Sequence, residues 1–156
     1  MLSFQNDYSE GAAPEIIEAL SATNLDSQPG YGSDQYCLQA QNKIKEVMSN
    51  PNADIFFLTG GTQTNAIVID AFLQKYQAVI SADSGHINIH EAGAIEAGGH
   101  KVIALKANNG KLEPNTLKEY LLAFYQDENH PHMAQPGMVY ISQPTELGTL
   151  YSKSEL

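Results

Sequence analysis

The sequence contains no arginine, and this absence limits what the chain can bind by itself. Its eight cationic residues are all lysines, against 18 aspartates and glutamates, so the net charge is −10 at pH 7. An acidic chain repels phosphate backbones and anionic lipid surfaces, so we expect neither nucleic acid nor membrane as a partner. Enzymes for anionic metabolites normally capture them with a guanidinium. Either this protein is no such enzyme, or its arginine lies on chain outside these 156 residues.

Cysteine and long apolar runs are also scarce. Cys37 is the single cysteine, which excludes an internal disulfide. The start, from Met1 to Asp7, lacks the basic and then apolar run of a signal peptide. No stretch approaches the roughly 18 to 20 apolar residues that span a bilayer. These absences predict a cytoplasmic protein.

What is present is a globular composition, 42% apolar, in which short apolar runs alternate with helical patterns. The runs that predict strands are 54–58, 78–82, 101–105 and 138–142. The segments with helical spacing are 62–73, 88–98 and a stretch that begins at Glu113-Pro114. Runs that are apolar on both faces and joined by helical crossovers indicate a parallel sheet with helices on both faces. The predicted fold class is therefore α/β.

Residues 1–52 differ from the rest, so we divide the chain there. They are predicted to form an amino-terminal helical arm and loop, with Asp34 as the N-cap of a helix and Cys37 on its apolar stripe, in the core. Residues 53–156 are predicted to be a truncated α/β domain, because another helix and strand would be expected after the last turn-rich loop. We therefore expect the chain to be a fragment of a longer protein.

A glycine turn offers the best local signal for chemistry. In Thr59-Gly60-Gly61-Thr62 the chain passes from a predicted strand into a predicted helix. Glycines let the backbone approach an anion, and a helix N-terminus supplies unpaired N–H groups. The pattern is neither a P-loop nor a dinucleotide fingerprint. A tight turn with threonine caps explains it equally well, so both interpretations stay open.

His86 and His90 follow the second predicted strand, at the edge of the sheet where α/β proteins bind ligands. Four residues apart on a helix, they would share a face and could, with Asp83, hold a metal ion. They could also be exposed imidazoles at the start of a helix. In the third interpretation, which we favour, His86 stacks on a ring or handles protons, and no metal is bound.

The order of these segments resembles the amino-terminal half of the threonine aldolase and β-eliminating lyase family. The resemblance runs from Asn6-Asp7 through Tyr31-Gly32-Ser33-Asp34, the Gly-Gly-Thr turn and the segment from His86 to Glu91-Ala-Gly-Ala, to Asn109-Gly110-Lys111-Leu112. Members of that family are pyridoxal-phosphate enzymes with the aspartate aminotransferase fold (fold type I). The resemblance therefore implies that residues 53–156 are part of a cofactor-binding large domain.

The resemblance also implies roles for individual residues. Gly60, Gly61 and Thr62 would bind the cofactor phosphate, and His86 would stack on the pyridine ring. Asn6, Asp7 and Tyr31 would contact the substrate, Tyr31 by reaching the active site of a neighbouring subunit. The implied substrate is a small amino acid, and the implied assembly is a homodimer or a dimer of dimers.

Two departures qualify these expectations. Where family aldolases often have a histidine that takes the substrate hydroxyl proton, this chain has Thr145 and Glu146, so either one of them would have to act or the reaction differs. The family's aspartate for the ring nitrogen, its arginines and its cofactor-binding lysine are matched nowhere in the chain. We therefore expect the 156 residues alone to be inactive. Two alternatives remain: a metal-dependent hydrolase that uses His86 and His90, and a non-catalytic module that binds small anions.

Overall fold

The computed structural model describes residue 6 and residues 8–156 and divides the chain into two compact units, Met1–Phe57 and Leu58–Leu156. The first unit contains α1 (Pro14–Thr23) and α2 (Gln35–Val47). Asp34 caps α2 as predicted, because its carboxylate accepts the Cys37 N–H at 2.8 Å. Hydrogen bonding with the Cys37 side chain, and after it the bond from the Cys37 N–H, holds the pKa of Asp34 below its ordinary value.

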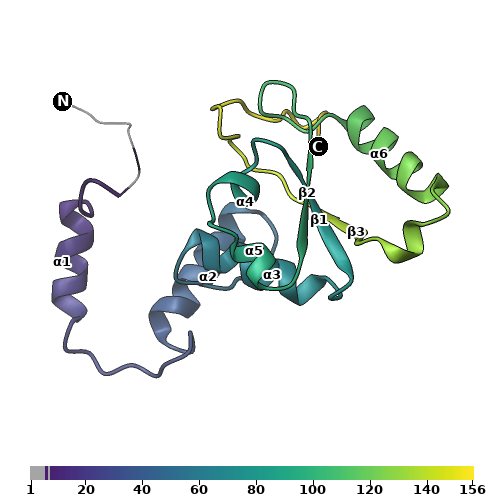
Figure 1. The fold of residues 1–156 in the computed structure, drawn as a ribbon. Coiled ribbons are helices and arrows are strands. Elements are labelled where there is room, and N and C mark those ends of the chain that lie inside the picture. Colours follow the sequence, from purple (N-terminus) through teal and green to yellow (C-terminus); the bar gives the residue numbers. More distant parts are fainter. Residues whose placement is uncertain (1–5, 7) are drawn as a thin grey trace. The chain divides into compact units, whose positions relative to one another are not determined.

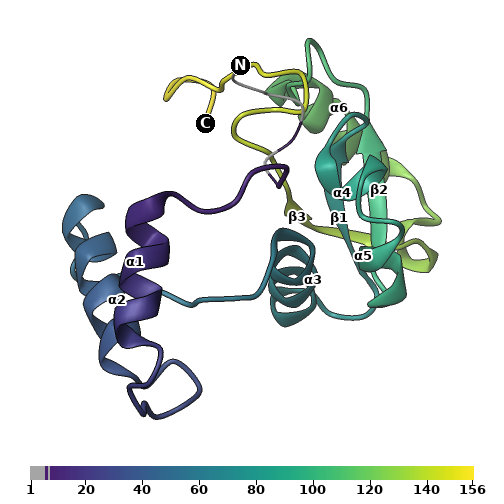
Figure 2. The same ribbon diagram turned by 90° about the vertical axis from the view of Figure 1, so that its left-hand side faces the viewer.

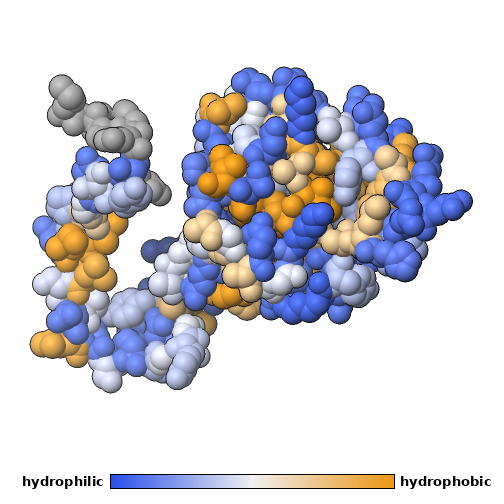
Figure 3. All heavy atoms as spheres, viewed as in Figure 1, coloured by the Kyte–Doolittle hydropathy of each residue, from blue (hydrophilic) through white to orange (hydrophobic). Residues whose placement is uncertain are grey.

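The apolar stripe predicted on α2 is not buried. Neither α1 nor α2 has a buried residue, and Cys37 is only half-buried, so its placement in the core is wrong. Val47 is 87% exposed, and Ile16 and Ile17 of α1 are also exposed. Figure 3 shows hydrophobic atoms at the surface over α1. The physical reason is that an amphipathic stripe becomes core only where another element covers it. Within the first unit, α1 does not cover α2 in this way.

The second unit is built on a parallel sheet of three strands in the order β2-β1-β3 (Figures 1 and 2). β1 (Gln77–Ala82) lies in the centre, between β2 (Lys101–Leu105) and β3 (Gln135–Val139). The helices are α3 (Gly61–Phe72), α4 (His86–Ile89), α5 (Ala94–Ala97) and α6 (Pro114–Gln126), with the short 3₁₀ helix η1 (His130–His132) after them. The predicted α/β class is confirmed.

Side chains that alternate along β1 form two cores, one on each face of the sheet. Val79 packs with Ile69 of α3, Ile87 of α4 and Ile95 of α5. On the other face, the residues of β1 and β2 that meet α6 are Ala78, Ile80, Ala82 and Ile103. Because both faces of β1 are covered, residues 78–82 are all buried and, apart from Ser81, apolar, and this is why the sequence pattern located the strand correctly.

Three predicted elements differ from the structure. Residues 54–58 form no strand, because an extended segment becomes a strand only when a neighbour pairs with it, and β1, β2 and β3 pair only with one another among the described residues. The helix predicted at 88–98 is interrupted, since Ala92 and Gly93 take positive φ values of 50° and 76°. β3 starts three residues before the predicted run at 138–142, because backbone pairing with Gln77 already begins at Gln135.

A buried histidine lies at the amino edge of the sheet, away from the carboxyl edge. His100 is 2% exposed; its Nδ1 is 3.2 Å from the Gln77 carbonyl oxygen and its Nε2 is 3.2 Å from Asp70 Oδ1. Lys75 also pairs with Asp70. Its hydrogen bond to Asp70 makes the largest contribution to lowering the pKa of that carboxyl, and the contact with His100 makes the next. The contacts tie the end of α3 to the starts of β1 and β2.

No helix in the described part of the chain is long and apolar enough to cross a membrane.

Candidate functional site

The candidate site lies at the carboxyl edge of the sheet, where β1 and β3 end. β1 ends at Ala82, and α4 begins four residues later with His86. β3 ends at Val139, and the chain runs on through a loop to Glu146. Because the two strands are parallel neighbours, the segments that follow them meet at one edge. His86 Nδ1 and Glu146 Oε1 are therefore only 2.9 Å apart, although 60 residues separate them.

Glu146 contacts two imidazoles. Besides the contact with His86, its Oε2 lies 3.5 Å from His90 Nε2. The two histidine rings are 5.4 Å apart between centroids. The side chains are 39% exposed for His86, 51% for His90 and 25% for Glu146, so the group faces solvent while remaining in mutual contact. Such an arrangement can accept, hold and release a proton.

A buried carboxylate, that of Glu91, lies next to the His86 imidazole on the side away from solvent. The Glu91 side chain is fully buried, and its Oε1 accepts a hydrogen bond from Asn65 Nδ2 at 2.7 Å. The same oxygen lies 3.8 Å from His86 Nε2, while Oε2 has no hydrogen-bond partner among the residues that the structure describes. The Asn65 amide also reaches the Tyr140 hydroxyl at 3.5 Å. Residue types alone did not single out Asn65 and Tyr140; the only available signal was their place one turn into α3 and next to the end of β3.

The glycine turn leads directly into α3, as predicted. Gly60 is the N-cap, and Thr64 is the first residue of α3 whose N–H bonds within the helix, to the Gly60 carbonyl at 2.9 Å. The three preceding N–H groups have no helical carbonyl to reach. A Cβ on Gly60 or Gly61 would meet nothing within 4 Å, so the space beside the turn is open. These donors and this space fit a phosphate group.

Thr145 and Glu146 play different parts in the loop. Thr145 is 6% exposed, and its hydroxyl oxygen lies 2.7 Å from the Thr149 hydroxyl oxygen and accepts the Thr149 N–H at 3.2 Å. Its side chain is thus used inside the loop, against Gly110, where a Cβ would come within 2.8 Å of it. The Glu146 side chain points instead to the histidines. The geometry favours Glu146 over Thr145 as the proton acceptor.

The predicted substrate residues lie in the first unit, and two of them, Asn6 and Tyr31, are among the described residues. Asn6 Oδ1 accepts hydrogen bonds from the Tyr8 N–H at 3.2 Å and the Ser9 hydroxyl at 2.6 Å. Tyr31 is fully exposed and takes a positive φ of 61°, which is unusual for a residue with a Cβ. Asp7 lies outside the described residues. The roles of all three stay predictions.

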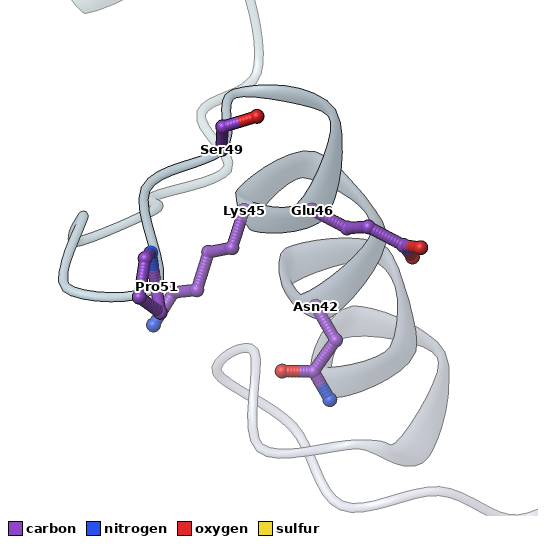
Figure 4. Close-up of a pocket in the computed structure, with 5 residues that line it drawn as sticks. All are labelled: Asn42, Lys45, Glu46, Ser49 and Pro51. Atoms are coloured by element: carbon purple, nitrogen blue, oxygen red, sulfur yellow. The ribbon is translucent and has the colours of Figure 1, made fainter.

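The structure gives little support to a metal site. Among the described residues, no three histidine, cysteine, aspartate or glutamate side chains are arranged to hold a metal ion. Asp83, the third ligand of that hypothesis, accepts the Ala107 N–H at 3.1 Å instead. An open hollow elsewhere, at the end of α2 in the first unit, is no better candidate, since the side chains of Asn42, Lys45 and Glu46 diverge around it (Figure 4).

Comparison with known proteins identifies the family. The sequence matches the beta-eliminating lyase family over residues 4–156. This chain belongs to that family. It is 30% identical over 155 residues to the low specificity L-threonine aldolases of Pseudomonas sp. (strain NCIMB 10558) and Pseudomonas aeruginosa, covering 98% of this chain and 43% of each relative.

A solved structure is also similar to this chain over less than half of its own length. The threonine aldolase of Leishmania major superposes with a TM-score of 0.88 at 42% identity, over 96% of this chain and 43% of that one. The predicted fold, the partial large domain of a fold type I enzyme, agrees with this match. The chain thus spans less than half the length of the relatives it matches.

Proposed function

We propose that this chain is the amino-terminal part of a pyridoxal-phosphate-dependent lyase that cleaves a β-hydroxy amino acid to glycine and an aldehyde. The observation that carries the proposal is the 2.9 Å contact between Glu146 and His86 at the carboxyl edge of the sheet. It places a carboxylate beside an imidazole where this fold class binds ligands. The printed names of the relatives, threonine aldolases, agree with this chemistry.

Three residues of the glycine turn would hold the cofactor. Gly60 and Gly61 allow close approach of a phosphate, and the first N–H groups of α3 and the Thr62 hydroxyl are available to donate to it. His86 would lie against the pyridine ring. When bound, pyridoxal phosphate supplies an electron sink for the electron pair of the Cα–Cβ bond. The family's lysine for covalent binding of the cofactor has no match here, so we expect it in a further segment of the protein.

Glu146 would begin the reaction by accepting the proton of the substrate's β-hydroxyl group. The oxygen then forms the carbonyl of the aldehyde as the Cα–Cβ bond breaks, and a proton returned to Cα completes glycine. His86 Nδ1, beside Glu146 Oε1, orients the carboxylate and can share the proton with it. Thr145 anchors the loop that presents Glu146.

We further propose that the complete protein is a cytoplasmic homodimer or dimer of dimers that acts on a small amino acid. In that assembly Tyr31 would reach the partner's site, and Asn6 and Asp7 would lie near the substrate carboxylate. The positive φ and full exposure of Tyr31 suit a residue whose contacts are supplied by a neighbouring chain. The division into a helical arm over residues 1–52 and a cofactor-binding domain over 53–156 is part of the same proposal.

The test compares this chain with the longer protein that we expect its reading frame to encode. With one equivalent of pyridoxal phosphate followed by gel filtration, the 156-residue chain should keep no visible absorbance of a lysine-bound cofactor, and it should release no aldehyde from threonine. The longer protein should keep that absorbance and release the aldehyde. Retention of one equivalent of lysine-bound cofactor by the short chain would contradict its proposed incompleteness, and a longer protein that releases no aldehyde from β-hydroxy amino acids would contradict the function.

A substitution tests the assignment of the base. In the longer protein, Glu146→Gln should lower kcat by roughly 10²- to 10⁴-fold, the usual contribution of a general base. Glu128→Gln, at an exposed glutamate beyond the end of α6, is the control and should leave kcat unchanged. If Glu146→Gln retains full kcat, the proton acceptor is another group. If the chain binds phosphate compounds but the longer protein has no lyase activity, a module that binds small anions becomes the better description.

A further inference from the structure

His90 has no part in the proposed reaction, yet its imidazole faces the residue on which that reaction depends. Its Nε2 is 3.5 Å from Glu146 Oε2, on the opposite oxygen from the one that His86 contacts at 2.9 Å. We propose that His90 is a positioning residue for Glu146, which holds the second carboxylate oxygen and so fixes the plane of the proton acceptor. This inference rests on the proposed function for its chemical meaning, but its geometry can be tested without activity.

The local structure explains why His90 points to Glu146. α4 is a single turn, and the His90 N–H closes it by donating to the His86 carbonyl at 2.9 Å. This spacing of four residues places both imidazoles on one face. Ile87, between them, is 2% exposed and packs into the core with Val79 and Ile95, which fixes the orientation of the turn. The pair of rings is thus held as a unit toward the loop of Glu146.

Glu146 needs a second contact because one contact leaves it free to rotate. Its side chain is a quarter exposed, and the terminal torsion of a glutamate has a broad energy minimum. The contact of His86 with Oε1 alone would allow the carboxylate to swing about that oxygen. A second contact on Oε2 removes this freedom, which matters because misplacement of a catalytic group by about 1 Å can cost large factors in rate.

The charged groups around His90 are consistent with this role. Glu146, from the loop after β3, faces its Nε2, and His86 of the same turn lies beside it. The neighbouring Glu91 is turned inward to Asn65 and is fully buried, so it does not compete for His90. In a neutral imidazole only one nitrogen carries a hydrogen, and a carboxylate can only accept. Nδ1 of His86 is 2.9 Å from Glu146 whereas its Nε2 is 3.8 Å from Glu91, so the shorter contact favours the hydrogen on Nδ1. The contact of His90 with Glu146 favours the hydrogen on its Nε2.

The first experiment is nitrogen NMR of the imidazoles in the 15N-labelled 156-residue chain, because the 15N shifts show which ring nitrogen carries the hydrogen. We expect the Nε2–H form at His90 and the Nδ1–H form at His86. In Glu146→Gln the side-chain carbonyl can accept from only one ring, so at least one of the two signals should change, while His132, on η1, should not change. Unchanged shifts at both His86 and His90 would overturn the proposal.

The second experiment measures kinetics in the longer protein. His90→Ala should lower kcat by roughly fivefold to tenfold with KM nearly unchanged, the scale of one partly exposed charged contact. His90→Gln, whose amide can donate to Glu146 from a similar position, should restore most of the loss, and His132→Gln is the matched control. If His90→Ala has wild-type kcat, or if glutamine gives no rescue, His90 does not position Glu146. A wild-type protein without lyase activity would refute the proposed function and leave the NMR result as the test of the contact.

Discussion

Gly85, the N-cap of α4, is the residue at which the chain leaves β1 for His86, and it has almost no room for a side chain. A Cβ built there would lie 2.1 Å from Ser81 Oγ and 3.0 Å from the Ala82 carbonyl oxygen. Ser81 is fully buried in the central strand, and within the described part of the chain its hydroxyl has no hydrogen-bond partner. The Gly85 backbone has an ordinary negative φ of −69°, so the effect of a substitution there would be steric rather than conformational.

We expect Gly85→Ala to lower the free energy of unfolding by about 1 to 3 kcal/mol, the cost of overpacking a well-packed core. Ser81→Ala removes the oxygen at 2.1 Å and also an unpaired buried hydroxyl, so it should be neutral or stabilising by up to roughly 1 kcal/mol. The double variant should therefore recover at least half of the loss. The residual cost comes from the Ala82 carbonyl, which stays in place.

The assay is urea unfolding followed by circular dichroism and by tyrosine fluorescence, since the chain has eight tyrosines and no tryptophan. A double-mutant cycle isolates the Gly85–Ser81 interaction, for which we expect about 1 to 2 kcal/mol. Gly11→Ala, where a Cβ would meet nothing within 4 Å, is the control and should change stability by less than about 0.5 kcal/mol. The steric reasoning is refuted if Gly85→Ala is as stable as wild type, or if Ser81→Ala gives no recovery.

Two further predictions concern parts of the second unit away from the site. Hydrogen bonds from Lys111 and then from the Ser152 N–H lower the pKa of Glu155 to about 2. The ionised carboxylate therefore stabilises the fold at pH values above the ordinary pKa of a glutamate, and this contribution is lost as the pH falls through about 2. The midpoints of urea unfolding of wild type and Glu155→Gln should thus differ at pH 6 and converge near pH 2; a difference independent of pH would contradict this assignment. His100→Leu, which removes two part-buried polar contacts with little change in volume, should lower the free energy of unfolding by about 1 to 3 kcal/mol. His132→Leu is the control, and equal stability of the two variants would show that the contacts of His100 are not needed.

The pattern of apolar residues was sufficient to predict the fold class and most of the second unit. The run at 78–82 is apolar on both faces because it is the central strand, and α3 and α6 show helical spacing because each covers one face of the sheet. The same reasoning failed at 54–58 and at 88–98. A strand requires a partner that is distant in sequence, and positive φ at Ala92 interrupts a composition that otherwise favours a helix.

The sequence by itself determined which groups the chain has available for chemistry: a glycine turn before a helix, two histidines four residues apart, and a threonine and a glutamate after the last strand. Only the tertiary structure decided how they combine. It showed that Glu146, not Thr145, faces the histidines, that His90 shares that carboxylate with His86, and that Asn65 holds Glu91 beneath them. The physical reason is that local spacing sets which side chains share a face of one turn. Contacts across 26 or 60 residues depend instead on the order and register of parallel strands.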